Sequence, residues 1–330
     1  MREESHMRIF FVEWNAEHGK LMIDNLSSHY NTAKISRVLH RYKTIQKHIH
    51  FSFLKKLHTK AHARLKFKNI TKNDLVICTG YSALAIIDMV ATLPCKKIII
   101  VRDTIEKLNY HMREKGLLTQ HEDYLGRIKT VFDKVYSFDQ LDCLNHDMVY
   151  LPQFISFTSQ QFISLAPSNN TPHSKTCFYV GGYDNYRVRT LNEIDLTIKE
   201  LNYTSDFYLV TKEDKEKYPA CCKNEFLSYK ENLEKIKHCE ILIEINRTGQ
   251  TGLTLRALEA LFFNKKLITT NNEIKKCDFY SPERIFIWGV DSLDSLSGFM
   301  NRTLPPINVK LMKNYTADTM LERLINDNSI

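Results

Sequence analysis

The chain has 330 residues, which is enough for two domains of ordinary size, each with its own core. Hydrophobic residues make up 43% and charged residues 25%, a composition that excludes a disordered chain and is typical of a soluble globular protein. The formal net charge is +8, and one basic segment, residues 37–68, has no Asp or Glu. No apolar run approaches the roughly 18 residues of a membrane span, and the N-terminus lacks the apolar region of a signal peptide, so we expect a cytoplasmic protein.

The first half of the chain alternates between apolar strand patterns and helical patterns. Strands are expected at residues 7–14, 74–80, 97–103, 134–139 and 148–151, and helices at 82–93, 106–115 and 124–132. Repeated βα units predict a doubly wound parallel sheet. Loops at the carboxyl ends of its strands line a ligand crevice. The candidates for an acceptor site or a catalytic base are therefore Glu17 and His18, in the polar loop 15–20, and Asp103, at the end of a strand. For Glu17 and His18, a pair of exposed loop residues without a catalytic role is the simpler interpretation.

The basic segment, residues 37–68, is rich in lysine and arginine and also contains Phe51, Phe53, Leu54 and Leu57. Basic amphipathic segments of this kind bind anionic membrane surfaces, where each cation contributes roughly 1 kcal/mol. Nucleic acid is a competing partner, but no nucleic-acid-binding motif is present, so we expect none. A solvated helical face is the remaining alternative. We expect peripheral contact with the inner face of the cytoplasmic membrane.

Residues 156–174 are rich in Ser, Thr, Gln and Asn and predict an interdomain linker. Beyond it, strands are expected at 176–182, 206–210, 241–245, 266–269 and 285–288, and helices at 191–201, 229–238, 293–299 and 315–324. The first of these strands ends in Gly181 and Gly182, where backbone N–H groups could approach a diphosphate, with Arg187 or Arg189 adding charge. The alternative is a tight turn with exposed arginines.

The stretch 246–262 is a strand-loop-helix connection and carries the strongest functional signal. Its loop contains Gly249 and Gly252, and Thr251 is predicted as the N-cap, so the start of the helix would form an anion site. Arg256 and Glu259 follow Gly252 at intervals of four and three residues and should share one side of the helix. The alternative is a loop shaped only by its glycines, beside a surface ion pair.

Between residues 249 and 280 the chain resembles the donor-binding half of bacterial GT-B glycosyltransferases from lipopolysaccharide and capsule biosynthesis. The resemblance depends on Gly249, Gln250, Gly252, Leu253, Thr254, Arg256, Glu259, Ala260, Leu261 and Phe262, followed by residues 265–269 and 278–280. It implies an α/β fold of two Rossmann-like doubly wound parallel-sheet domains that face a central cleft. The expected domains are 1–165 for the acceptor, including the basic segment, 166–310 for the nucleotide-sugar, and 311–330, a helix that packs back on the first domain.

The resemblance also implies an activity, namely transfer of a sugar from a nucleotide-sugar donor to a lipopolysaccharide core or lipid-linked acceptor. A core rhamnosyltransferase is the closest subclass. Glu259 matches the carboxylate that holds the donor ribose in this superfamily, whereas Thr251 replaces a second glutamate of the retaining enzymes, so stereochemistry does not follow. Predicted donor-binding residues are Gly181, Gly182, Arg187, Thr248, Gly249, Gln250, Gly252, Thr254, Arg256 and Glu259.

No cofactor or metal is expected, because the chain has no Asp-x-Asp triplet and its eight scattered cysteines lack Cys-x-x-Cys spacing. The cysteines are predicted to be reduced core thiols. Two other functions remain open. A nucleotide-sugar 2-epimerase or hydrolase shares the fold and needs no acceptor, and a non-enzymatic binding protein would use only the basic segment.

Overall fold

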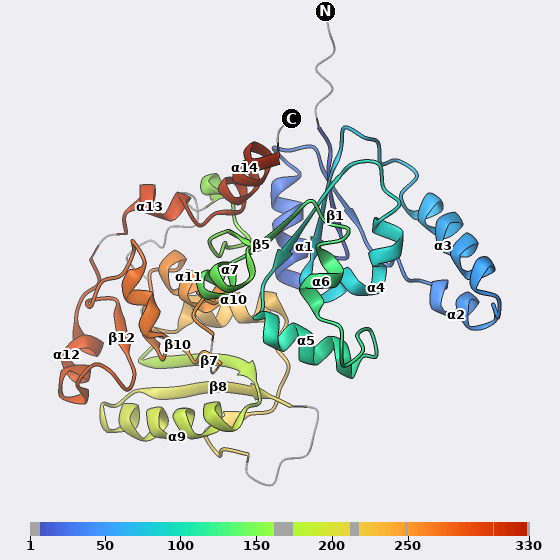
Figure 1. Cartoon of the computed structure of the whole chain (residues 1–330). Helices are drawn as coiled ribbons and strands as arrows, with labels where there is room; N and C mark the ends of the chain where they lie inside the picture. Colours follow the sequence, from blue (N-terminus) through green and yellow to red (C-terminus); the bar gives the residue numbers. More distant parts are fainter. Residues whose placement is uncertain (1–6, 162–173, 212–217, 248–249, 306, 329–330) are drawn as a thin grey trace, which may run out of the picture. The chain divides into compact units, whose positions relative to one another are not determined.

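The computed structural model describes residues 7–161, 174–211, 218–247, 250–305 and 307–328. The chain forms two compact units, unit 1 with residues 1–152 and 321–330, and unit 2 with residues 153–320 (Figure 1). The predicted boundaries, 165/166 and 310/311, differ from this division. Residues 153–161 and 311–320 belong to unit 2. Their backbones bond to each other, Ile155 N to Tyr315 O at 2.9 Å, and they are tied to the rest of the unit because Gln153 donates to the Leu253 carbonyl at 3.2 Å and the Tyr315 hydroxyl donates to Asp278.

Unit 1 is built on a six-stranded parallel sheet with the order β2-β1-β3-β4-β5-β6. The strands are β1 (Ile9–Val12), β2 (Thr32–Ile35), β3 (Leu75–Thr79), β4 (Lys96–Val101), β5 (Lys134–Ser137) and β6 (Val149–Tyr150). The five strands expected from the sequence are present. Strand β2 was not predicted, because it is a half-exposed edge strand whose sequence Thr-Ala-Lys-Ile has little apolar character.

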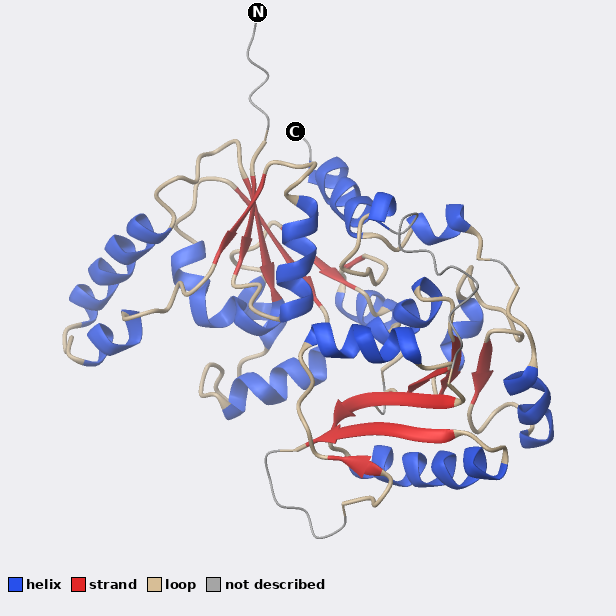
Figure 2. Cartoon of the chain, turned by 180° about the vertical axis from the view of Figure 1, so that it is seen from behind, coloured by secondary structure: helices blue, strands red, loops and turns tan. Residues whose placement is uncertain are grey.

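The helices of unit 1 flank this sheet (Figure 2). They are α1 (Glu17–Leu26), α2 (Tyr42–Lys47), α3 (Ser52–Lys66), α4 (Gly80–Val90), α5 (Ile105–Glu114), α6 (Tyr124–Ile128) and α7 (Gln140–His146). The last helix of the chain, α14 (Ala317–Asn328), ends on unit 1. There the Asn328 side chain donates to the Tyr136 hydroxyl at 3.0 Å, and Lys96 Nζ donates to the Asn328 carbonyl at 2.8 Å.

Unit 2 contains a second six-stranded parallel sheet, with the order β12-β11-β10-β7-β8-β9. Its strands are β7 (Thr176–Gly182), β8 (Thr204–Val210), β9 (Cys222–Lys223), β10 (Ile241–Glu244), β11 (Lys266–Thr269) and β12 (Ile285–Ile287). Its helices are α9 (Asn185–Glu200), α10 (Tyr229–His238), α11 (Leu255–Phe262), α12 (Leu296–Asn301) and α13 (Val309–Lys313), with short 3₁₀ turns η1 (Asn272–Lys276) and η2 (Leu293–Ser295). The predicted class, two Rossmann-like α/β domains, is confirmed.

Each sheet has a topological switch point, where strands are added first on one side and then on the other. It lies between β1 and β3 in unit 1 and between β7 and β10 in unit 2. Ligands of open α/β sheets bind outside the carboxyl ends of the strands at such points. In unit 2, β7 pairs with β8 along its whole length but with β10 only through Cys177 and Phe178. Beyond that pairing, a gap separates the carboxyl ends of β7 and β10.

Candidate functional site

The Arg187 guanidinium spans the gap between the carboxyl ends of β7 and β10. Its Nη1 donates to the Gly182 carbonyl at 3.0 Å, and its Nη2 and Nε donate to the Ile245 carbonyl at 3.1 and 3.3 Å. Asp184 caps the helix that carries it, by accepting from Tyr186 N at 2.9 Å. Arg187 is therefore half-buried and fixed, not part of an exposed turn, and it brings a positive charge to the switch point.

The two glycines at the end of β7 have different surroundings. A Cβ on Gly181 would overlap the Tyr179 hydroxyl, whereas a Cβ on Gly182 would meet no atom within 4 Å. A side chain at the first position would force the buried Tyr179 ring to move, and the backbone of the second is open to a ligand. The Tyr179 hydroxyl has no hydrogen-bond partner among the described residues, and burial raises its pKa to about 12. A buried polar group of this kind is a candidate ligand contact.

Two asparagines shape the loop between β10 and α11. Asn246 donates from its amide to the Gln250 carbonyl at 3.3 Å, and Asn271 donates to the Thr251 carbonyl at 3.3 Å. The Asn246 Oδ1 atom is buried and, in the part of the chain that is described, accepts no hydrogen bond. Thr248 and Gly249, two of the predicted donor contacts, lie outside the described residues.

Helix α11 begins later than predicted, because Thr254 and not Thr251 is its N-cap. The Thr254 hydroxyl accepts from Arg256 N at 3.1 Å and donates to the Glu244 carboxylate at the end of β10. Glu244 also accepts from the Thr269 hydroxyl, so it ties the helix to β11. Burial raises the pKa of Glu244, and these hydrogen bonds oppose that shift. Gly252 consequently precedes the helix and does not share its side with the two charged residues.

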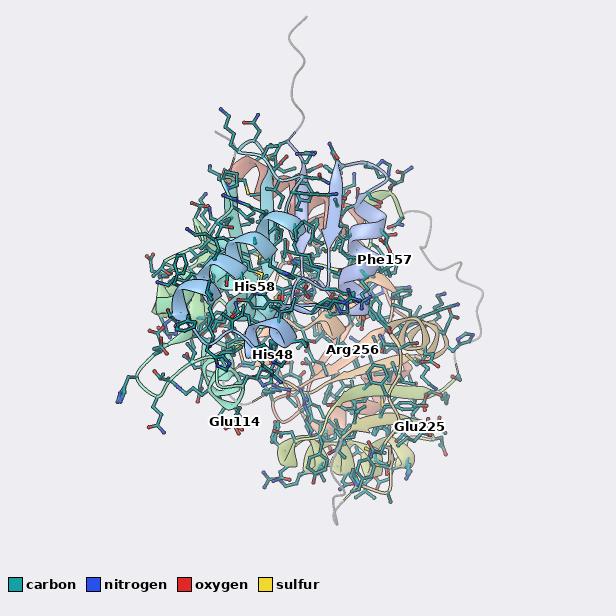
Figure 3. The ribbon with its side chains drawn as sticks, turned by 90° about the vertical axis from the view of Figure 1, so that its right-hand side faces the viewer. His48, His58, Glu114, Phe157, Glu225 and Arg256 are labelled. Atoms are coloured by element: carbon teal, nitrogen blue, oxygen red, sulfur yellow. The ribbon has the colours of Figure 1, made fainter. Side chains whose placement is uncertain are left out.

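Arg256, which is labelled in Figure 3, forms a buried ion pair with Glu259. Arg256 Nη1 lies 2.8 Å from Glu259 Oε2, and the two side chains are 11% and 2% exposed. Asn232 of α10 bridges them, accepting from Arg256 Nη2 at 3.0 Å and donating to Glu259 Oε1 at 3.3 Å. The guanidinium also lies 5.2 Å from the centroid of the Phe178 ring. The alternative of a surface ion pair is therefore wrong. The contact between Glu259 and the donor ribose stays a prediction, and it requires a ribose hydroxyl to replace one of the present partners of the Glu259 carboxylate.

The catalytic candidates in unit 1 lie near the carboxyl edge of its sheet. Glu17 and His18 are in the first turn of α1 and not in a loop, because the helix starts directly after a short turn. Burial and the Arg102 cation lower the pKa of His18 to about 3, so the imidazole stays neutral. Asp103 is already paired, since it accepts from the Tyr81 hydroxyl at 2.8 Å and forms an ion pair with Lys107.

Sequence reasoning missed four residues of these sites: Tyr81, Tyr179, Glu244 and Asn246. A signal existed for Glu244, which is a carboxylate within the apolar run Ile-Leu-Ile-Glu-Ile. A charge in a central strand is costly unless its oxygens are hydrogen-bonded, so it indicates a local polar network. Within the described ranges, no group of three potential metal ligands comes together.

Comparisons with known proteins identify the fold. No family model matches the sequence, and no curated protein sequence matches it. The structure is similar to Anabaena HepE in complex with UDP-glucose, with 10% identity, a TM-score of 0.59, and coverage of 98% of this chain and 100% of the other. It is also similar to a UDP-forming α,α-trehalose-phosphate synthase from Burkholderia xenovorans, with 8% identity, a TM-score of 0.57, and coverage of 97% and 98%. The chain has the GT-B fold, as predicted, and these neighbours include glycosyltransferases.

Proposed function

We propose that the protein transfers a sugar from a nucleotide-sugar donor to a lipopolysaccharide core or lipid-linked saccharide acceptor. The observation that carries the proposal is the β7/β10 switch point, where the Arg187 cation, the open backbone of Gly182 and two unsatisfied buried oxygens, on Tyr179 and Asn246, surround the strand ends. A departing nucleoside diphosphate needs a cation and hydrogen-bond donors to stabilise its growing charge, and Arg187 and the Tyr179 hydroxyl could supply them. Asn246 Oδ1 can only accept, so it would suit a hydroxyl of the donor. The likeness to HepE, whose complexes hold UDP and UDP-glucose, supports the proposal.

Unit 2 would bind the donor and unit 1 the acceptor, with rhamnose as the candidate sugar. Deprotonation of the acceptor hydroxyl requires a base, for which we propose Asp103, with Glu17 and His18 as alternatives. Hydrogen bonds and an ion pair with Tyr81 and Lys107 hold the Asp103 carboxylate in place near the carboxyl edge of the sheet. No metal or other cofactor enters this scheme.

A nucleotide panel tests the proposal. Thermal unfolding is measured with UDP, GDP, dTDP and CMP, and one of them should raise the melting temperature, because a ligand that binds only the native state stabilises it. The matching nucleotide-sugar is then incubated with the protein in the absence of an acceptor. Slow leakage supports a transferase, rapid turnover supports the epimerase or hydrolase, and no response to any nucleotide supports the non-enzymatic binding protein.

We also propose that helices α2 and α3 contact an anionic membrane surface. Large apolar side chains are exposed there next to lysines and arginines, with Phe51 71%, Phe53 72%, Leu57 54% and Leu65 74% exposed. His48 and His58, labelled in Figure 3, belong to the same basic segment. Neither helix is long and apolar enough to cross a bilayer, and the same holds for the other described helices. Exposed apolar groups flanked by cations suit shallow insertion into an anionic leaflet.

Liposome sedimentation tests the membrane contact. Wild-type protein should sediment with anionic vesicles at low salt and much less at high salt. Replacement of Phe51 and Phe53 by serine should reduce sedimentation. The control replaces two equally exposed apolar residues elsewhere, Leu144 (83% exposed) and Phe226 (77% exposed), and should sediment like wild type. Equal sedimentation of both double variants would contradict the assignment to α2 and α3.

A further inference from the structure

Tyr81 lies at the switch point of the unit 1 sheet, directly beyond the carboxyl end of β3. It belongs to the first turn of α4, and its side chain is 39% exposed. Because the order of strands reverses between β1 and β3, this is the edge at which an open α/β sheet binds its ligand. An exposed aromatic ring at that edge offers an apolar face on which a pyranose ring can pack.

Cations surround the Tyr81 ring. Lys107 Nζ and Lys115 Nζ lie 5.5 and 6.0 Å from its centroid, and the His111 ring meets it edge-on at 5.3 Å. Lys115 is exposed at the end of α5 and forms no salt bridge with any other described residue. The pKa of His111 is lowered, by burial first and then by Lys115 and Lys107, while Asp103 and Glu114 oppose the shift.

Asp103 orients this aromatic ring and does not neutralise the cluster. Its carboxylate accepts from the Tyr81 hydroxyl at 2.8 Å, forms the ion pair with Lys107, and accepts from Thr104 N at 3.1 Å. The Asp103 carboxylate therefore fixes both the Tyr81 ring and the Lys107 ammonium group. Among the described residues, no carboxylate forms an ion pair with the Lys115 ammonium group. The ion pair of Asp103 and Lys107 alone does not account for the position of the partly exposed Tyr81 ring between Lys107 and Lys115.

We propose that Tyr81, Lys107 and Lys115 bind a sugar of the acceptor that bears an oxyanion, with the pyranose on the tyrosine ring and the anionic group at the lysine ammonium groups. The inference rests on the proposed function, which it narrows to acceptors with a phosphate or carboxylate near the reactive sugar. Opposite charges in a partly desolvated site add both affinity and orientation.

Saturation-transfer NMR and titration with glucose 6-phosphate, glucose and inorganic phosphate test the inference. Wild-type protein should bind glucose 6-phosphate more tightly than either of the other two probes. Tyr81→Ala should weaken that binding by about 10-fold or more through loss of the aromatic face, and Lys115→Gln by about 3-fold or more through loss of charge. Tyr81→Phe should keep most of the affinity. The matched control, Tyr110→Ala, removes another exposed tyrosine, 66% exposed on α5, and should bind like wild type.

The same proteins are titrated with UDP so that the two proposals can fail separately. Equal binding of glucose and glucose 6-phosphate would overturn the role of charge, and equal binding of phosphate and glucose 6-phosphate would overturn the role of the ring. If UDP raises the melting temperature but none of the three probes binds, the acceptor subsite is wrong and the proposed function stands. If neither UDP nor any other nucleotide binds, the proposed function itself is wrong.

Discussion

Removal of one partner from the buried pair of Arg256 and Glu259 should destabilise unit 2. Glu259→Ala would leave a guanidinium that is 11% exposed without its carboxylate, and such a change costs roughly 3–5 kcal/mol. For a unit of this size that corresponds to a fall of about 6–20 °C in melting temperature. The control is Glu273→Ala, which breaks an exposed pair with Lys276 at the same i,i+3 spacing and should cost under about 1 kcal/mol.

A double variant separates the structural role of the pair from its role in donor binding. Arg256→Met combined with Glu259→Leu removes both charges and should recover most of the stability, because apolar side chains of similar size replace a buried ion pair well. If Glu259 also holds the ribose, the double variant should still bind the preferred nucleotide about 1–3 kcal/mol more weakly than wild type.

Differential scanning calorimetry and isothermal titration calorimetry measure the two effects on the same preparations. A wild-type melting temperature in Glu259→Ala would refute the reasoning from burial. Wild-type nucleotide affinity in the double variant would refute the assignment of Glu259 to the ribose and leave the pair with a structural role only. Arg256→Ala should lower the melting temperature as Glu259→Ala does, because it leaves a buried carboxylate without its cation, and its hydrogen bonds from Asn232 and Tyr229 carry no compensating charge.

The remaining predictions concern the switch point of unit 2 and the pH dependence of stability. Gly182→Ala should leave the melting temperature unchanged, because the new Cβ meets no atom within 4 Å, but should weaken nucleotide binding in calorimetric titration, whereas Gly181→Ala should lower the melting temperature through overlap with Tyr179. Burial opposes ionisation of Asp74, but hydrogen bonds from Arg8 and Thr71 outweigh it and lower the pKa. The stability contributed by a lowered carboxyl pKa is present above the unfolded-state value of about 4 and is lost as pH falls through the folded-state value. Asp74→Asn has no carboxyl group to protonate at this position, so in thermal unfolding it should lose less stability between pH 5 and 3 than wild type does.

The sequence by itself determined the alternation of strands and helices and the approximate place of most elements. Strand β11 and helix α10 begin and end at the predicted residues, since a continuous apolar run and a helical repeat flanked by capping residues are local signals. The sequence also singled out the connection between β10 and α11, because its glycines and its charges are close together in the chain, and the role of this connection in donor binding stays a prediction.

Only the tertiary structure decided which partners the candidate side chains contact. Arg187 reaches Ile245 across 58 positions of sequence, and Asn232 joins Arg256 from 24 positions away, so neither contact has a local pattern. The N-cap moved from Thr251 to Thr254 because the buried carboxylate of Glu244 accepts the Thr254 hydroxyl, ten residues further along the chain. Periodicity records which face of an element is buried, whereas the partner of a buried polar group depends on which distant segment the fold brings beside it.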